Sequence, residues 1–222
     1  MFASLNTLKQ LDLSDNKLLT INDNSFVGLD QLEWLNLHGN NLWKIPANGL
    51  QSLKRLQYLN VGQNQFAQLT TGDFVQLSVQ EIRLTNCPNL VLVDRGAFWD
   101  LPNAKEIYLD NNPRLEFIDA QSFLGAPSLK LITLHNTSLA TVLPDVISNI
   151  ASTISSTTTY SHENLNNINN NNNYNYNINS GNSSHHHHHK KIIHITLKGN
   201  PILCDCNIHY LYQVSHSFSF SM

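Results

Sequence analysis

Several kinds of residue and segment are scarce in this chain of 222 residues, and each scarcity excludes a class of protein. Basic residues number 13 and acidic residues 16, which gives a formal charge of −3, so the sequence has no positive surplus for nucleic acid or an anionic membrane. No apolar run approaches the roughly 20 residues of a membrane helix, and the start of the chain lacks the basic and apolar segments of a signal peptide. We therefore expect no nucleic-acid partner and no membrane contact by this segment.

Motifs that carry catalysis are also missing from the sequence. It contains no G-x-S-x-G, G-x-x-x-x-G-K, G-x-G-x-x-G or H-E-x-x-H, which serve as nucleophile elbow, phosphate loop, dinucleotide loop and helical zinc pair. The sequence therefore predicts a protein that is not an enzyme and has no cofactor and no metal site.

What the chain has in abundance is a repeated apolar frame, L-x-x-L-x-L-x-x-N-x-L. The first copy reads Leu8, Leu11, Leu13, Asn16, Leu18. Further copies begin at Leu32, Leu56, Val79, Ala104, Leu129 and Ile192. The first six starts follow one another at a nearly constant interval of about 24 residues, and an interval of this length is the signature of a stacked repeat architecture. The seventh start lies much further downstream of the sixth.

The frame predicts an α/β leucine-rich-repeat solenoid, a horseshoe with a parallel concave sheet and an irregular or short-helical convex side. Within each copy the L-x-L alternation puts two apolar residues on one face of a short strand and their neighbours in solvent. Strands of successive copies stack about 4.8 Å apart, and because the connections on the far side need more room, the stack curves.

Two further series of residues are predicted to be structural. The Asn of each frame sits where the chain turns inward, so its amide can satisfy backbone groups that no strand reaches. The members of this ladder are Asn16, Asn40, Asn64, Asn112 and Asn200, with Cys87 as a buried thiol at one ladder position. An aromatic spine on the far side comprises Phe2, Phe26, Phe74, Phe98 and Phe123, with Leu50 in the second copy.

The period near 24, the convex Phe series and the run Asn200-Pro201-Ile202-Leu203-Cys204-Asp205-Cys206 together resemble the extracellular leucine-rich-repeat proteins of animals. The N-P-x-x-C-x-C motif opens the cysteine-rich C-terminal cap of Toll-like, Slit-like and immunoglobulin-containing members. The resemblance implies a secreted protein or a receptor ectodomain that binds a protein on its concave face or flanks. It also implies that Cys204 and Cys206 form disulfides with cysteines further downstream.

The chain departs from that family at its ends. No cysteine follows Cys206, and the sequence begins inside a repeat, so we expect a fragment of a longer secreted protein. The expected organisation is leucine-rich repeats over 1–147, a disordered Ser/Thr-, Asn- and His-rich insertion over 148–190, the last repeat over 191–203 and a truncated C-terminal cap over 204–222.

The insertion accounts for the long gap between the sixth and seventh copies. Twelve of the nineteen residues from Asn164 to Asn182 are Asn, and His185 to His189 follow. Such a tract cannot bury enough apolar surface to offset the entropy of ordering. It is either a tolerated surface insertion or translated noncoding sequence. A flexible His run imposes no coordination geometry, so it does not predict a metal site.

Candidate binding residues come from the strand positions that point away from the core. These positions fall into columns across the sheet, and aromatic residues and Arg are favoured anchors of interfaces. An aromatic patch is predicted around Trp34 and Tyr58, and a polar one around Arg83. The full predicted set is Trp34, Asn36, His38, Tyr58, Asn60, Glu81, Arg83, Tyr108 and Asp110. The alternative is a solvated sheet face with aromatic residues placed by chance.

Three interpretations of the function follow. The first is a non-enzymatic, protein-binding module of a secreted or cell-surface receptor or adhesion protein, with an N-glycosylation acceptor at Asn136 and another at Asn182. The second is an intracellular leucine-rich-repeat scaffold or adaptor, in which Cys204 and Cys206 stay reduced. A nonfunctional conceptual translation is a third possibility. The ligand cannot be read from the sequence.

Overall fold

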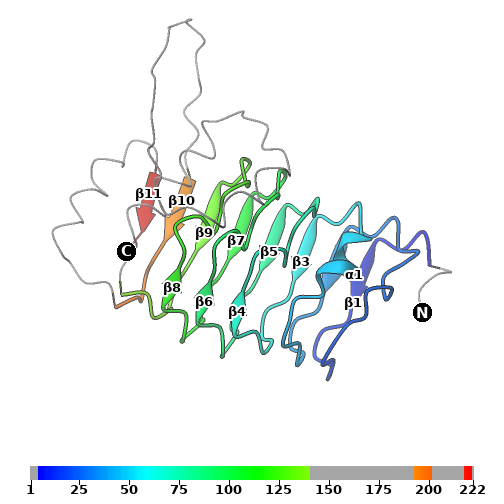
Figure 1. Ribbon diagram of the computed structural model, residues 1–222, viewed down its shortest axis with the longest axis horizontal. Coiled ribbons are helices and arrows are strands. Elements are labelled where there is room, and N and C mark those ends of the chain that lie inside the picture. The colour runs from blue at the N-terminus through cyan, green and yellow to red at the C-terminus, as the bar shows by residue number, and fades with distance from the viewer. Residues whose placement is uncertain (1–4, 141–192, 202–217, 222) are drawn as a thin grey trace, which may run out of the picture.

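The computed structural model describes residues 5–140, 193–201 and 218–221. These residues form one solenoid, in which successive coils of the chain lie side by side from the N-terminal end toward the C-terminal end (Figure 1). The expected leucine-rich-repeat solenoid is thus confirmed. Phe2, the insertion at 148–190, Asn182, Cys204 and Cys206 lie outside the described residues.

Each coil contributes one short strand to a parallel sheet. The order of strands in this eight-stranded sheet is β1-β2-β3-β5-β7-β9-β10-β11. The strands are β1 (Gln10–Asp12), β2 (Trp34–Asn36), β3 (Tyr58–Asn60), β5 (Glu81–Arg83), β7 (Glu106–Tyr108), β9 (Leu131–Thr133), β10 (Ile193–Thr196) and β11 (Phe218–Ser221). Every pairing is parallel, and the pairings from β1 to β10 keep the register of the frame, with Leu35 opposite both Leu11 and Leu59. β10 pairs directly with β9, His194 opposite Leu131, although the two strands are far apart in the sequence.

The core lies between the strands and the returning segments of the coils. Leu35, Leu59, Ile82 and Ile107 are completely buried in it, as the period-two alternation predicts. The convex aromatic spine is buried as well. Phe74 and Phe98 stack with ring centroids 5.4 Å apart, and Phe98 and Phe123 stack at 5.2 Å. One copy could not bury these faces alone, so stability comes from stacking.

The Asn ladder joins neighbouring coils. Asn64 is fully buried, its Oδ1 accepts the N–H of Leu42 in the preceding coil, and its Nδ2 donates to the carbonyl of Leu37 in that same coil. Asn112 does the same one step later, since it accepts the N–H of Cys87 and donates to the carbonyl of Leu84. The predicted structural role of these residues is confirmed.

A left-handed backbone position precedes the ladder residue in every coil, and this feature was not predicted. The chain takes a positive φ there at Asp15, Gly39, Gln63, Asn86, Asn111, Asn136 and Gly199. At Gly39 a Cβ would lie 2.1 Å from Oδ1 of Asp15, so the side chain of one coil occupies the space that glycine leaves in the next.

A second, smaller sheet runs along the other side of the coils, at the lower edge in Figure 1. It consists of β4 (Gln68–Leu69), β6 (Leu92–Val93) and β8 (Phe117–Ile118) in the order β4-β6-β8. The sequence predicted an irregular or short-helical convex side. Within the described residues a single α-helix, α1 (Ala47–Gln51), lies there, and no helix is long and apolar enough to cross a membrane. Inward-facing Leu69, Val93 and Ile118 favour the extended backbone instead.

Candidate binding face on the large sheet

We call the solvent-facing side of the eight-stranded sheet the strand face. All nine predicted binding residues lie on it, on a strand or within two residues of its end, and all are half-buried. They stand there because each follows or precedes a buried residue of the alternating strand. Their role as binding residues is an expectation from the sequence.

An aromatic and cationic row crosses four neighbouring strands of this face. Trp34 on β2 and Tyr58 on β3 stack with their ring centroids 5.3 Å apart and their planes inclined by 7°. The guanidinium carbon of Arg83 on β5 lies 5.9 Å from the Tyr58 ring centroid and 4.5 Å from that of Tyr108 on β7. We call Trp34, Tyr58, Arg83 and Tyr108 the stacked row.

The stacked row joins the two patches that the sequence predicted separately. Tyr58 pairs in register with Glu81 and Arg83 with Asn60, so the Tyr58 ring and the Arg83 side chain are diagonal neighbours. A diagonal pair of this kind is within the reach of long side chains. The sequence predicted Trp34 beside Tyr58 and Arg83 beside Tyr108, but not the contact between Tyr58 and Arg83 that joins the two patches.

Charged groups hold the stacked row in place. Nε of Arg83 donates to Oε1 of Glu81 at 2.6 Å, and the Tyr108 hydroxyl donates to Oε2 of Glu106 at 2.6 Å. Burial lowers the pKa of Arg83, but the hydrogen bond and charge of Glu81 outweigh it and hold the pKa above its ordinary value. Burial, together with Glu106, raises the pKa of Tyr108 to about 12. Arg83 therefore keeps its positive charge, paired with Glu81, and both Arg83 and Tyr108 are hydrogen-bonded to a carboxylate of their own strand.

Three predicted residues accept hydrogen bonds from backbone N–H groups. Oδ1 of Asn36 accepts the N–H of His38 at 3.1 Å, and Oδ1 of Asn60 accepts the N–H of Gly62 at 3.0 Å. Asp110 accepts the Thr133 hydroxyl at 2.5 Å and the N–H of His135 at 2.7 Å. The sequence placed Asp110 with Arg83, but its hydrogen-bond donors Thr133 and His135 belong to the next coil. Asn36, Asn60 and Asp110 thus support the turns that follow the strands.

His38 is held in an unusual way. Its Nδ1 is buried and has no hydrogen-bond partner among the described residues. A Cβ at Gly62 would lie 3.1 Å from this nitrogen and 2.7 Å from the carbonyl oxygen of Thr85. The absence of a side chain at Gly62 therefore leaves room for the imidazole ring. Because Nδ1 is buried, His38 offers a partner its ring surface rather than this nitrogen.

Asn136 and Cys87, the predicted glycosylation acceptor and the predicted buried thiol, differ in their exposure. Asn136 is exposed, and its Nδ2 donates to Oδ1 of Asn111 at 2.8 Å. Cys87 is fully buried, and burial raises the pKa of its thiol to about 11. Within the described residues no three His, Cys, Asp or Glu side chains are grouped as metal ligands would be.

Two family profiles match the sequence. One, described as Leucine rich repeat, matches residues 1–42 and 34–88, and the other, described as BspA type Leucine rich repeat region (6 copies), matches residues 68–198. The second profile alone spans more than half of the chain. The chain belongs to the leucine-rich-repeat proteins. No curated protein matches it significantly.

Solved structures share the fold of this leucine-rich-repeat chain. The mouse RP105/MD-1 complex is 21% identical with a TM-score of 0.65, and covers 96% of this chain and 30% of that one. The Toll–Spatzle complex of Drosophila is 18% identical with a TM-score of 0.54, over 66% of this chain and 22% of that one. A TLR13–ssRNA13 complex is 24% identical with a TM-score of 0.50, over 68% and 24%. This leucine-rich-repeat chain spans less than a third of the length of each.

Proposed function

We propose that this leucine-rich-repeat chain is a non-enzymatic module that binds a protein ligand on its strand face, as part of a secreted or cell-surface receptor. The observation that carries the proposal is the stacked row, which presents Trp34, Tyr58, Arg83 and Tyr108 across four strands. Tyr, Trp and Arg are the residues most enriched among the anchors of protein interfaces. Because the row is already ordered, binding costs little side-chain entropy.

The similar solved structures support a protein partner. Two of them are complexes with a second protein, Spatzle and MD-1, and the third is a complex with single-stranded RNA. The net charge of −3 argues against RNA as the partner of this chain. One of the similar structures is nevertheless a complex with RNA, so the comparisons do not support excluding an RNA partner. A single-stranded RNA probe therefore belongs in the test.

The binding experiment compares variants of the strand face with a variant outside it. The chain is produced by secretion from animal cells, and proteins that it captures from cell surfaces and conditioned medium are cross-linked and identified. We expect Trp34→Ala or Tyr108→Ala to abolish capture of a specific protein and Phe117→Ala, which removes an exposed ring from β8 in the smaller sheet, to leave it unchanged. Capture that is indifferent to Trp34 and Tyr108, or binding to the RNA probe alone, would refute the proposal.

The extracellular location is the second part of the proposal, and the N-P-x-x-C-x-C motif and the exposed Asn136 support it. We expect a secreted product with sugar on Asn136, seen as a mass loss on enzymatic deglycosylation that Asn136→Gln removes. Cys204 and Cys206 should be oxidised. Retention in the cytosol with free thiols would favour an intracellular scaffold or adaptor instead.

A further inference from the structure

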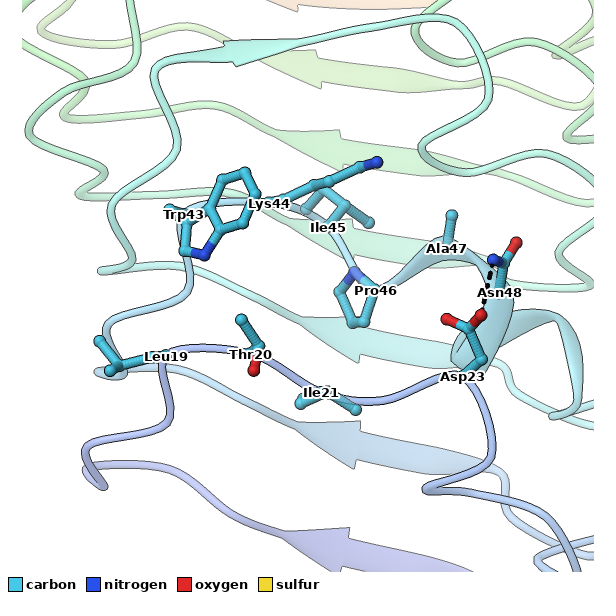
Figure 2. Close-up of a pocket in the computed structure, with 10 residues that line it drawn as sticks. All are labelled: Leu19, Thr20, Ile21, Asp23, Trp43, Lys44, Ile45, Pro46, Ala47 and Asn48. Atoms are coloured by element: carbon cyan, nitrogen blue, oxygen red, sulfur yellow. Dashed lines mark hydrogen bonds between the residues drawn. The ribbon is translucent and has the colours of Figure 1, made fainter.

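Two large apolar side chains stand exposed on the flank opposite the strand face. Leu19 is 64% exposed and Trp43 62%, the highest values among the large apolar residues that the structure describes. Both lie eleven positions after the start of their copies, at Leu8 and Leu32, so they occupy equivalent places in neighbouring coils. Figure 2 shows them side by side at one end of a hollow between these coils. Apolar residues gathered in this way mark contact sites.

The hollow exists because the smaller sheet does not extend to the first two coils. In the third to fifth coils the equivalent stretch pairs as β4, β6 and β8. In the second coil the equivalent residues are Lys44 and Ile45, and they form no strand pairing. Pro46, which comes next, has no N–H to donate. The two coils therefore leave between them a hollow of about 170 Å³ with Ile21 and Pro46 in its wall.

The size of the hollow limits what can occupy it. Sites for cofactors and other small ligands measure about 300–1,000 Å³, so this hollow is too small for one and accepts a single large side chain. An aromatic side chain buries about 150–250 Å², whereas a stable dimer needs about 800 Å² per partner. Two exposed apolar side chains therefore suit a short peptide segment better than a second copy of the chain.

The charges of the wall indicate what should flank the apolar side chain. Of the two charged residues that line the hollow, Asp23 already accepts a hydrogen bond from Nδ2 of Asn48 at 3.1 Å, which closes the far end in Figure 2. Lys44 is exposed and has no ion-pair partner within 4.0 Å in the described part of the chain. Burial raises the pKa of Asp73 in the next coil and the charge of Lys44 counteracts this, but the Asp73 carboxylate accepts the N–H and the hydroxyl of Thr70 and forms no ion pair with Lys44. In Figure 2 the Lys44 ammonium group points away from Leu19 and Ile21, so an anionic group can meet it at the rim of the hollow rather than inside it.

We propose that this flank hollow binds a short extended peptide segment of a partner protein, in which one large apolar side chain stands next to an Asp or Glu. The apolar side chain enters between Leu19 and Trp43, and the carboxylate meets the ammonium group of Lys44. The site is separate from the strand face, so a partner bound there leaves the stacked row accessible.

The test uses random twelve-residue peptides displayed on phage and selected against the full chain. Synthetic copies of the enriched peptides are then titrated by calorimetry. We expect enriched peptides to combine a Leu, Ile, Phe or Trp with an adjacent acidic residue. Trp43→Ala should weaken their binding at least tenfold, Trp43→Phe should retain most of it, and Trp34→Ala on the strand face should leave it unchanged.

Charge reversal provides the second arm. With Lys44→Glu, the selected peptides should bind at least fivefold more weakly, and a repeated selection should enrich Lys or Arg beside the apolar residue. Because Trp43 and Lys44 are exposed, circular dichroism should be the same for their variants and the parent chain. The proposal is overturned if no enriched peptide depends on Trp43, if Lys44→Glu leaves the charge preference unchanged, or if sedimentation shows self-association that Trp43→Ala abolishes. Loss of binding in Trp34→Ala alone would implicate the strand face instead.

Discussion

Asn64 illustrates how one side chain can connect two coils. It is completely buried, and its amide accepts one backbone N–H and donates to the carbonyls of Leu37, Val61 and Gly62. Without it those backbone groups would be buried and unpaired, and each such group costs about 1–3 kcal/mol. A buried polar residue is favourable here because every one of its hydrogen-bonding atoms has a partner.

At the residue scale we predict that Asn64→Ala lowers the free energy of unfolding by about 3 kcal/mol. The matched control is Asn16→Ala, because the Asn16 amide is exposed and donates only within its own coil, to Leu13 and Ser14. Its loss should cost about 1 kcal/mol or less. Urea unfolding followed by circular dichroism measures both, and equal losses would contradict the cross-coil role of the ladder.

Cys87 makes a second prediction at this scale, on pH. Burial raises the pKa of the folded thiol from 9.0 to about 11, so between these values the unfolded chain loses its proton and the folded chain keeps it. The contribution of the protonated Cys87 thiol to the free energy of unfolding is therefore complete below pH 9. It declines as pH rises toward 11, by about 2–3 kcal/mol in all. We expect Cys87→Ala to show a weaker decline of unfolding free energy over this range than the parent chain. Parallel declines in the two proteins would disprove it.

At the scale of the element, four neighbouring strands of the large sheet each present a buried residue between two half-exposed ones. Burial in β2, β3, β5 and β7 follows this alternation. The sequence predicted these strands and their register from the L-x-L spacing, because a slip by one residue would turn every apolar side chain into solvent. The smaller sheet could not be predicted in the same way, because its strands are two residues long and too short to show an alternation of apolar and polar residues.

Leu59 and Tyr58 are neighbours in β3 with opposite surroundings, and this contrast gives the prediction for the element. Leu59→Asp puts a carboxylate among buried apolar residues, and we expect a loss above about 5 kcal/mol and an unfolded chain. Tyr58→Ala removes a stacked ring from the strand face and should cost about 1 kcal/mol. Far-ultraviolet circular dichroism separates the outcomes, and a native spectrum for Leu59→Asp would contradict the assignment of the core.

On the scale of the whole molecule, coils contact mainly their neighbours, so a long excursion of the chain between two coils need not disturb the stack. β9 and β10 show this, because Leu131 and His194 pair in register although a long stretch of sequence separates them. An ordinary coil of this chain takes about 24 residues, so residues 152–190 are in excess of one coil.

We therefore predict that a variant lacking residues 152–190 folds into the same solenoid. Shortening the connection to the length of an ordinary coil reduces the entropy of loop closure and should stabilise the fold by about 1 kcal/mol. Thermal unfolding and size-exclusion chromatography measure the effect against the full chain. A variant that fails to fold would show that the excised segment contributes to the stack.

The sequence by itself determined the solenoid, the period, the register of the large sheet and the inward positions of Leu35, Leu59 and Ile82, because a repeated frame imposes the same local geometry on each coil. It also predicted which residues face solvent on that sheet. Only the tertiary structure decided how those side chains meet. Arg83 lies between Tyr58 and Tyr108, and Asp110 turns to the next coil, because contacts between coils depend on rotamers and diagonal distances that no linear spacing encodes. The hollow beside Trp43 has the same origin, since it arises where backbone pairing between two coils stops.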